Sequence, residues 1–233
     1  MTMRRKAPVA AVLVLLLATA CGAEGSGQDA GSDDRTGSGG TSALDRAALA
    51  AADLPGYQVS ATKPGAASEG RPAADRAKCQ PLADVMGDRP SPTAGETVTR
   101  GIGSTRYPGL AVSASLSAYT EADARKLIKD LDAAVGECGT GFGVKLAGKD
   151  GAYEDVKAQP YRVGGDESVS WTLTAAAKNV TAPVHMVVVR EGTTVVRLMA
   201  LDVTGGQQPR PRTEVPREVA DKQLAKLAGA PVG

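Results

Sequence analysis

The sequence predicts an α+β domain in which about four helices flank a mainly antiparallel sheet of about six or seven strands. Residues 110–117 and 169–175 alternate between apolar and mostly hydroxyl-bearing side chains, which is typical of strands with one buried face. Residues 124–135 instead repeat apolar side chains every three or four positions, which is typical of a helix packed on a sheet. Glu191-Gly192-Thr193 separates two Val-rich runs and predicts a hairpin of two central strands.

The first half of the domain is expected to contain two short helices and three strands. Ser42 is a typical N-cap for a helix over residues 44–53, which Pro55-Gly56 stops. Pro81 starts the second helix, because proline is tolerated in the first helical turn. The strands expected here are residues 57–61, 97–105 and 110–117, and Tyr107-Pro108-Gly109 is a type II turn between the last two.

The second half is expected to contain two longer helices and four strands. Thr120 and Asp123 predict a capped start for the third helix, and Gly136 predicts its end. Residues 139–149 are Gly-rich, and Gly139–Gly143 within them is interpreted as a flexible connection. The expected strands are residues 153–157, 169–175, 184–190 and 194–203. Pro216 opens the last helix, whose apolar positions are Val219, Ala220, Leu224 and Leu227.

The N-terminus has the three parts of a secretory signal peptide over residues 1–20. A basic segment at residues 4–6 precedes an apolar segment, and Ala18-Thr19-Ala20 follows. The uncharged run over residues 7–20 has 14 residues, fewer than the ~20 that a membrane-spanning helix needs. Cys21 follows directly, so the segment resembles a bacterial lipoprotein signal. The resemblance implies that Cys21 carries a diacylglycerol thioether; the alternative is a secreted protein with a free Cys21 thiol.

The remaining chain divides into a linker and one domain. Residues 22–42, after the lipidated Cys21, are almost free of apolar side chains and are expected to be a flexible linker, and residues 43–233 form the α+β domain. Removing residues 1–20 removes three of the 27 basic side chains and none of the 26 acidic ones, which leaves a net charge of −2. This charge gives no reason to expect nucleic acid as a partner. The lipid bilayer is expected as a partner through acylated Cys21, which places the protein at the outer face of the cell membrane.

Cys79 and Cys138 are the other two cysteines, and outside the cytosol such a pair is expected to form a disulfide. Two free thiols are the alternative. A metal site is less consistent with the sequence, because the two cysteines lie far apart and His185 is the single histidine.

The sequence offers few candidates for catalysis. His185 lies inside an expected central strand and is interpreted as a packed residue. Gly139–Gly143 follows a helix, whereas a dinucleotide-binding loop follows a strand. The clustered carboxylates are interpreted as solvated turn residues, although two of them could act as acid and base; they are Asp150, Glu154, Asp155, Asp166 and Glu167. The Asn179-Val180-Thr181 glycosylation motif is interpreted as chance. We therefore predict no catalytic, cofactor-binding or metal-binding residue and no enzymatic activity.

Four short motifs mark the domain: Leu54-Pro55-Gly56, Tyr119–Ala124, Gly165–Ser168 and Ala225-Lys226-Leu227. With a cysteine before the second helix and another after the third, residues 43–230 resemble actinobacterial lipoproteins and the extracellular sensor domains of mycobacterial receptor serine/threonine kinases of the H type. The resemblance implies an antiparallel sheet flanked by helices and a ligand-binding role, and it supplies no catalytic residues. Those sensor domains carry two disulfides, whereas this chain has cysteines for one.

The function expected from the sequence is a membrane-anchored, non-catalytic, ligand-binding or sensor-like module of the cell envelope. Its partner would be an unidentified small ligand or an envelope protein. One alternative is an interaction subunit of a membrane or wall complex, which would show a sizeable exposed apolar patch. The other is an envelope hydrolase that uses carboxylates between Asp150 and Glu167.

Overall fold

The computed structural model describes residues 41–62, 70–178, 180–204 and 213–230. All of them belong to one of the two units into which the chain divides, residues 40–233. The expected signal peptide, Cys21 and nearly all of the expected linker lie outside the described residues.

The described residues form four α-helices and a nine-stranded sheet, so the predicted α+β class is confirmed and the predicted strand count was too low. The helices are α1 (Ala43–Ala47), α2 (Gln80–Met86), α3 (Glu121–Glu137) and α4 (Arg217–Ala228), with short 3-10 helices η1 (Ala51–Asp53) and η2 (Ala77–Cys79). The strands are β1 (Tyr57–Ala61), β2 (Ala73–Ala74), β3 (Glu96–Ser104), β4 (Leu110–Ala118), β5 (Phe142–Leu146), β6 (Lys149–Ala158), β7 (Glu167–Ala177), β8 (Val180–Glu191) and β9 (Thr194–Asp202).

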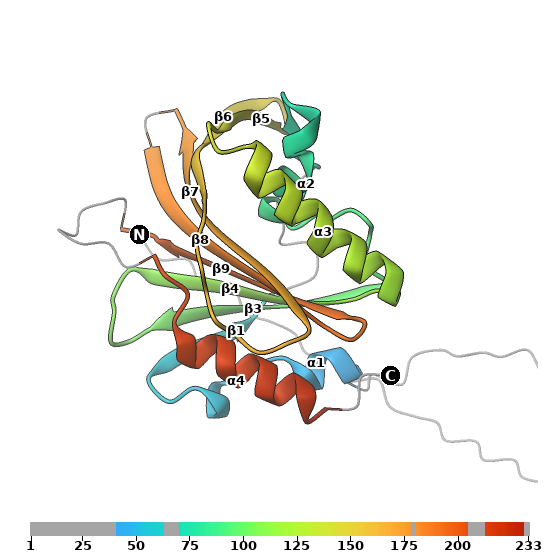
Figure 1. The fold of residues 1–233 in the computed structure, drawn as a ribbon. Helices are drawn as coiled ribbons and strands as arrows, with labels where there is room; N and C mark the ends of the chain where they lie inside the picture. Colours follow the sequence, from blue (N-terminus) through green and yellow to red (C-terminus); the bar gives the residue numbers. More distant parts are fainter. Residues whose placement is uncertain (1–40, 63–69, 179, 205–212, 231–233) are drawn as a thin grey trace, which may run out of the picture. The chain divides into compact units, whose positions relative to one another are not determined.

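The strands lie in the order β1-β3-β4-β9-β8-β7-β6-β5-β2, and every neighbouring pair is antiparallel. The hairpin of β8 and β9 occupies the middle of the sheet, as its Val-rich sequence predicts. Figure 1 shows α3 beside the end of the sheet that contains β5 to β7, and α1 and α4 beside the other end.

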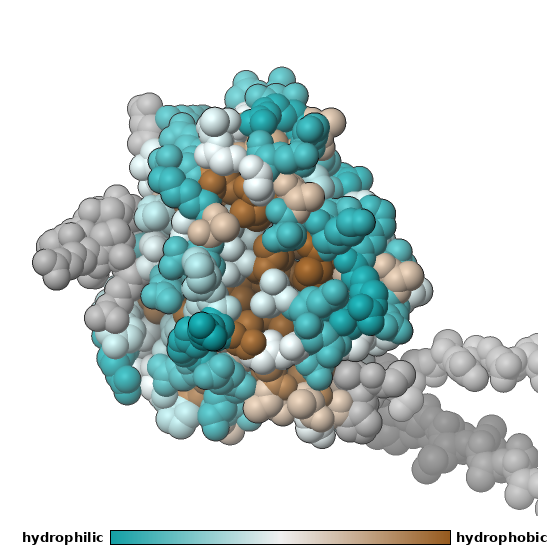
Figure 2. All heavy atoms as spheres, in the orientation of Figure 1, coloured by the Kyte–Doolittle hydropathy of each residue, from teal (hydrophilic) through white to brown (hydrophobic). Residues whose placement is uncertain are grey.

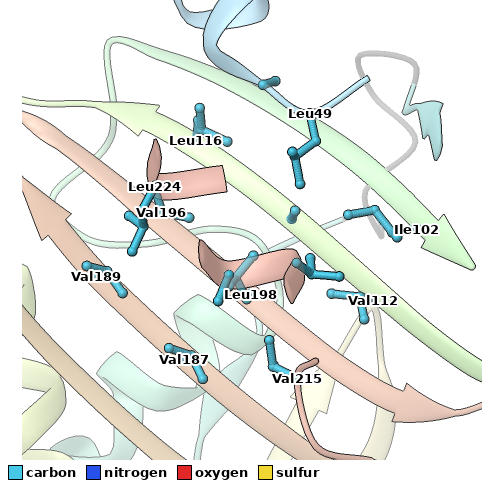
Figure 3. Packing of buried hydrophobic residues seen from close by; sticks show 14 of the residues in the cluster. Leu49, Ile102, Val112, Leu116, Val187, Val189, Val196, Leu198, Val215 and Leu224 are labelled. Carbon is cyan, nitrogen blue, oxygen red and sulfur yellow. The ribbon is translucent and has the colours of Figure 1, made fainter. Parts of the chain in front are cut away.

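Two hydrophobic cores form because alternate side chains of each strand point to opposite faces of the sheet. On one face, which we call the α4 face, β3, β4, β8 and β9 pack against α1 and α4. Figure 3 shows Val187, Val196 and Leu198 of the central strands in one cluster with Leu224 of α4, and Val196 is drawn beside Leu224. On the other face, the α3 face, β5 to β9 pack against α2 and α3, with Trp171 fully buried among them.

The predicted helix over residues 44–53 is wrong in its length, because α1 ends at Ala47. The backbone at Ala48 is extended and turns the side chain of Leu49 into the core. The buried side chain of Gln223 on α4 holds this turn: its Oε1 accepts from the Leu49 N–H (3.2 Å), and its Nε2 donates to the Ala47 carbonyl (2.8 Å). We call these two bonds the Gln223 clamp. The sequence of residues 44–53 gives no indication of Gln223 as a partner, because Gln223 lies more than 170 positions further along the chain.

The predicted flexible connection over Gly139–Gly143 is wrong as well, because β5 begins at Phe142. Gly141 has φ +85°, and a Cβ atom there would come within 2.5 Å of the Tyr153 carbonyl oxygen, so glycine allows the turn into β5. Gly143 has its Cβ position occupied by the Asp75 carboxylate. Gly141 and Gly143 therefore allow close packing of the chain around β5. The two-residue strand β2 was also missed, since it is too short to show a period.

A disulfide joins Cys79, at the end of η2, to Cys138, the residue that follows α3. Both cysteines are fully buried, so neither sulfur is a free thiol or a metal ligand in this structure. The bond fixes the start of α2 against the end of α3. It agrees with the pairing expected from the cysteine count.

Candidate ligand-binding groove

The α3 face has a floor of mostly small side chains where β1, β3 and β4 run side by side. The strand register places these residues together: Gln58 and Ser60 of β1, Gly101 and Gly103 of β3, and Ala111 and Ser113 of β4. A hollow of about 430 Å³ lies over this floor. A Cβ atom at Gly103 would have no other atom within 4 Å, so the space above β3 is open.

A second hollow, of about 760 Å³, lies further along β3, and Thr62 lines both hollows. Thr97 and Thr99 line the second hollow and belong to the same face of β3 as Gly101 and Gly103, because side chains alternate along a strand. The charged residues around it are Asp45, Arg71, Asp88, Arg89 and Arg100. We call the two hollows together the β3 groove, with a glycine end and an arginine end.

Arg197 of β9 lies beneath the arginine end and is 8% exposed. Its Nη2 lies 2.8 Å from Asp88 Oδ1 and donates to Ser115 Oγ (2.9 Å), and its Nη1 donates to the Val85 carbonyl (2.9 Å). Burial lowers the pKa of Arg197, while the charge of Asp88 opposes this shift. The side chain therefore fixes the C-terminal end of α2 and the following residues to the middle of the sheet.

Pairs of hydroxyl groups connect β3 to β4 under the same end of the groove. Thr97 lies 2.9 Å from Ser117, and Thr99 lies 2.9 Å from Ser115, oxygen to oxygen. Ser115 is only 1% exposed, so its hydroxyl depends on these partners. The sequence predicted a half-buried β4 with its serines on the second face; the structure instead buries two of those serines under the groove.

A third hollow, of about 720 Å³, lies between Tyr57 and residues 213–218. Here the Tyr57 hydroxyl donates to the Glu218 carboxylate, and burial together with this carboxylate raises the pKa of Tyr57 well above its usual value. Tyr57 therefore stays protonated and already has its partner. For this reason we take the β3 groove as the stronger candidate site.

His185 is buried on the α4 face, beneath the segment before α4, and lines none of these hollows. Its Nδ1 accepts a hydrogen bond from the Val215 N–H (3.0 Å), so the ring proton of the neutral form is on Nε2. Its ring lies 5.4 Å from that of Tyr161, whose hydroxyl donates to the Val215 carbonyl (3.1 Å). Burial lowers the pKa of His185, and the charge of Glu214 opposes this only in part. The geometry gives His185 a packing role.

We expect the protein to lose stability in mild acid because of His185. Its pKa in the folded state is below the unfolded value of about 6.5, so the unfolded chain takes up the proton more readily, and stability is lost as the pH falls below about 6.5. Urea unfolding at pH values from about 7.5 to 5 measures this. His185→Gln keeps an acceptor for the Val215 N–H and removes the titration, so this variant should lose less stability over the same range. Equal losses in both proteins would contradict the assignment.

The structure does not assemble the clustered carboxylates into one site. Asp166 and Glu167 both bind Arg190, at 2.8 and 2.5 Å, and the hydrogen bond from the Gly192 N–H holds the pKa of Asp166 below its usual value. Asp150 and Asp155 instead pair with lysines of β5 and β6. Glu154 is in register with Thr174, seven positions along β7 from Glu167, or about 23 Å. The five carboxylates therefore do not meet at one site, and the two that lie close together, Asp166 and Glu167, are both ion-paired with Arg190.

The described residues do not meet the requirements for a metal site or for a membrane-spanning helix. No group of three or more His, Cys, Asp or Glu side chains in this part of the chain is placed to hold a metal ion. Among the helices in the same ranges, none combines the length and the apolar character needed to cross a membrane. Asn179 of the glycosylation motif lies outside the described residues.

Comparison with solved structures identifies the architecture. The extracellular domain of PknH from Mycobacterium tuberculosis matches 82% of this chain and 95% of that chain, with a TM-score of 0.52 and 12% sequence identity. The domain has the fold of the PknH extracellular domain. The resemblance drawn from the short sequence motifs is thus confirmed at the level of the fold.

A second similar structure is an uncharacterised protein from Mycobacterium smegmatis, described as the Rv0999 ortholog. It matches 75% of this chain and 90% of that chain, with a TM-score of 0.45 and 16% identity. No protein-family model matches the sequence, and no curated protein matches it.

Proposed function

We propose that this protein is a lipid-anchored, non-catalytic, sensor-like module on the outer face of the cell membrane that binds a ligand in the β3 groove. The signal pattern ending at Cys21 supports the anchor and the compartment. The Cys79–Cys138 disulfide is typical of an oxidising environment outside the cytosol. The shared fold with an extracellular domain supports the same compartment.

The open floor of the β3 groove is the observation that carries the ligand-binding role. A sheet face without a covering layer normally presents large polar side chains to water. Here the floor has Gly101, Gly103 and Ala111 instead, and the backbone is accessible at Gly103, whereas Ser60 Oγ lies 3.1 Å from the position of a Cβ atom at Gly101. Glycine in the interior of a strand is unfavourable, and one established reason for it is the close approach of a ligand.

The role of interaction subunit finds less support, because it needs a sizeable exposed apolar patch. Figure 2 shows only a narrow strip of hydrophobic residues between hydrophilic ones on the face that it draws. Within the described ranges, Val180 and Val203 are the large hydrophobic side chains that are exposed. The strip is therefore made mostly of side chains that are largely buried and visible only between their polar neighbours.

The anchor is tested by the variant Cys21→Ser. Acyl chains contribute about 0.8 kcal/mol per buried CH₂, so a protein with two or three chains stays bound to the bilayer. We expect the wild type in the membrane fraction, with an N-terminal peptide that carries the mass of a diacylglycerol group on Cys21. The variant should appear in the medium. Wild-type protein that begins at Met1 without a lipid would overturn the proposed anchor.

The groove is tested by the variant Gly103→Leu, which places a large side chain over the open floor at a position where a Cβ atom meets no other atom within 4 Å. Full-length protein is purified from membranes, and released small molecules are identified by mass spectrometry. We expect a molecule that accompanies the wild type and is lost from Gly103→Leu. The matched control is Gly136→Leu on α3, where a Cβ atom also meets nothing within 4 Å. A molecule retained by all three proteins would exclude the groove as its site.

A further inference from the structure

The arginine end of the β3 groove has one more cation than it has carboxylates to pair with. Three arginines around or beneath it each bind a carboxylate: Arg71 binds Asp84, Arg100 binds Asp45 at 2.7 Å, and Arg197 binds Asp88 at 2.8 Å. Arg89 also lines this hollow, and within the described ranges its side chain has no ion pair or hydrogen bond. The carboxylates are therefore occupied, and one guanidinium is available to a ligand.

The backbone that carries Arg89 is held in place. The Arg89 N–H donates to the Asp84 carbonyl (2.8 Å), and the preceding Asp88 has φ +57° and is bound by Arg197. Arg197 also binds the Val85 carbonyl at the end of α2. Arg89 thus extends from a fixed point at the edge of the groove, which reduces the entropy lost when it binds a ligand.

The hydroxyl groups beneath the groove also direct a donor toward it. Ser115 Oγ accepts from Arg197, and because Ser115 is buried its own hydrogen needs an acceptor, which Thr99 Oγ1 provides at 2.9 Å. The Thr99 hydroxyl can then donate its own hydrogen to a ligand atom in the hollow that Thr99 lines. Arg89 and Thr99 together present donors, which fits a ligand group that only accepts hydrogen bonds.

The two ends of the groove differ in chemistry and are separated along β3. Thr97 and Gly103 are six positions apart, or about 20 Å. The arginine end is charged, whereas the glycine end combines bare backbone with the hydroxyl groups of Ser60 and Ser113 and the apolar side chain of Leu201. A flat floor with scattered hydroxyl groups suits a ring that is apolar on its face and polar at its edge. These dimensions fit an elongated ligand of several rings.

We propose that the ligand is an acidic oligosaccharide, with sugar rings over Gly101 and Gly103 and a carboxylate that binds Arg89 and Thr99. This rests on the proposed ligand-binding role of the groove and names the chemical class of its ligand. A carboxylate on each of several sugar units would let one anionic group reach Arg89 while neighbouring rings lie on the glycine end. Inorganic phosphate is also an anion but has no sugar rings. Binding of phosphate can therefore be distinguished by experiment from binding of an acidic oligosaccharide.

The test is calorimetric titration of the full-length protein in detergent with trigalacturonate at low ionic strength. Arg89→Gln should weaken binding about tenfold, the size expected for one exposed charge-assisted hydrogen bond. Lys129→Gln removes one positive charge from the exposed side of α3 and is the matched control, for which we expect unchanged affinity. Added salt should weaken binding to the wild type more than binding to Arg89→Gln.

The methyl ester of trigalacturonate has the same rings without the charge and should bind as weakly to the wild type as the acid binds to Arg89→Gln. Equal affinity for acid and ester, or inorganic phosphate binding as tightly as the acid, would overturn the proposed ligand class, as would the absence of any trigalacturonate binding. Gly103→Leu separates the two levels of the proposal. Binding lost in Gly103→Leu but unchanged in Arg89→Gln would keep the groove and overturn the acidic ligand; binding unchanged in both would overturn the groove as well.

Discussion

Replacing Arg197 with alanine should lower the free energy of unfolding by about 3–5 kcal/mol, because removal of one partner of a buried ion pair leaves the other partners unsatisfied. In this case they are Asp88, the Ser115 hydroxyl and the Val85 carbonyl. Water can reach Asp88, whose side chain is 28% exposed, so we expect the lower part of this range. Urea unfolding followed by circular dichroism measures the change.

Two further variants test whether the buried pair itself causes the loss. The double variant Arg197→Met with Asp88→Asn removes both charges, and asparagine tolerates the φ of +57° at position 88. It should recover much of the stability, since a buried pair is often replaced by uncharged groups at little cost. Arg125→Ala removes an arginine whose ion pair with Glu121 is exposed, and it should shift the unfolding midpoint only slightly. An Arg197→Ala protein as stable as Arg125→Ala would mean that the cation does not hold α2 to the sheet.

Loss of the disulfide is the other change expected to have a large effect. Cys79→Ser should lower the free energy of unfolding by about 4 kcal/mol, because the bond closes a loop of 59 residues and restricts the unfolded chain. Thermal unfolding of the variant, compared with wild type before and after chemical reduction, separates loss of the bond from the new buried hydroxyl. Reduced wild type and Cys79→Ser should unfold at similar temperatures.

Thiol labelling gives a second measurement for the same variant. Native wild type should label at neither Cys79 nor Cys138, since both are buried and bonded. Partly unfolded Cys79→Ser should label at Cys138, and at Cys21 only where that residue carries no lipid. Labelling of both cysteines in the native wild type would show that the bond is absent.

Local sequence signals were sufficient for the elements that their own residues stabilise. The start of α3 was predicted because Thr120 Oγ1 accepts from the Asp123 N–H (3.1 Å), a bond between residues three positions apart. The apolar repeat of α3 is buried as predicted, from Ala124 to Val135. The central position of β8 and β9 was also predicted, because strands buried on both faces have apolar side chains at nearly every position.

The candidate site could not be predicted in this way, because its residues meet only through the sheet register. Gly103 lies beside Gln58 and Ala111, and nothing near any of them in the sequence marks the others as neighbours. The sequence did contain one signal for this site. Gly101 and Gly103 occupy alternate positions of a run that otherwise has a strand-like composition, and glycines inside a strand indicate that another group approaches the backbone closely. Arg197 gave a weaker signal, as a charged residue inside a Val-rich run.

The Gln223 clamp has a mechanical consequence if the chain is anchored through Cys21 as proposed. A pull on the chain from the N-terminal side would reach α1 first, and a helix of five residues has almost no stability of its own. The load would therefore pass to α4 through the two hydrogen bonds of Gln223 and to β3 through Arg100, which binds Asp45 and the Leu49 carbonyl. Tension on the N-terminal segment would then be transmitted to β3, which also forms the floor of the groove. Tension and ligand binding would therefore act on the same strand.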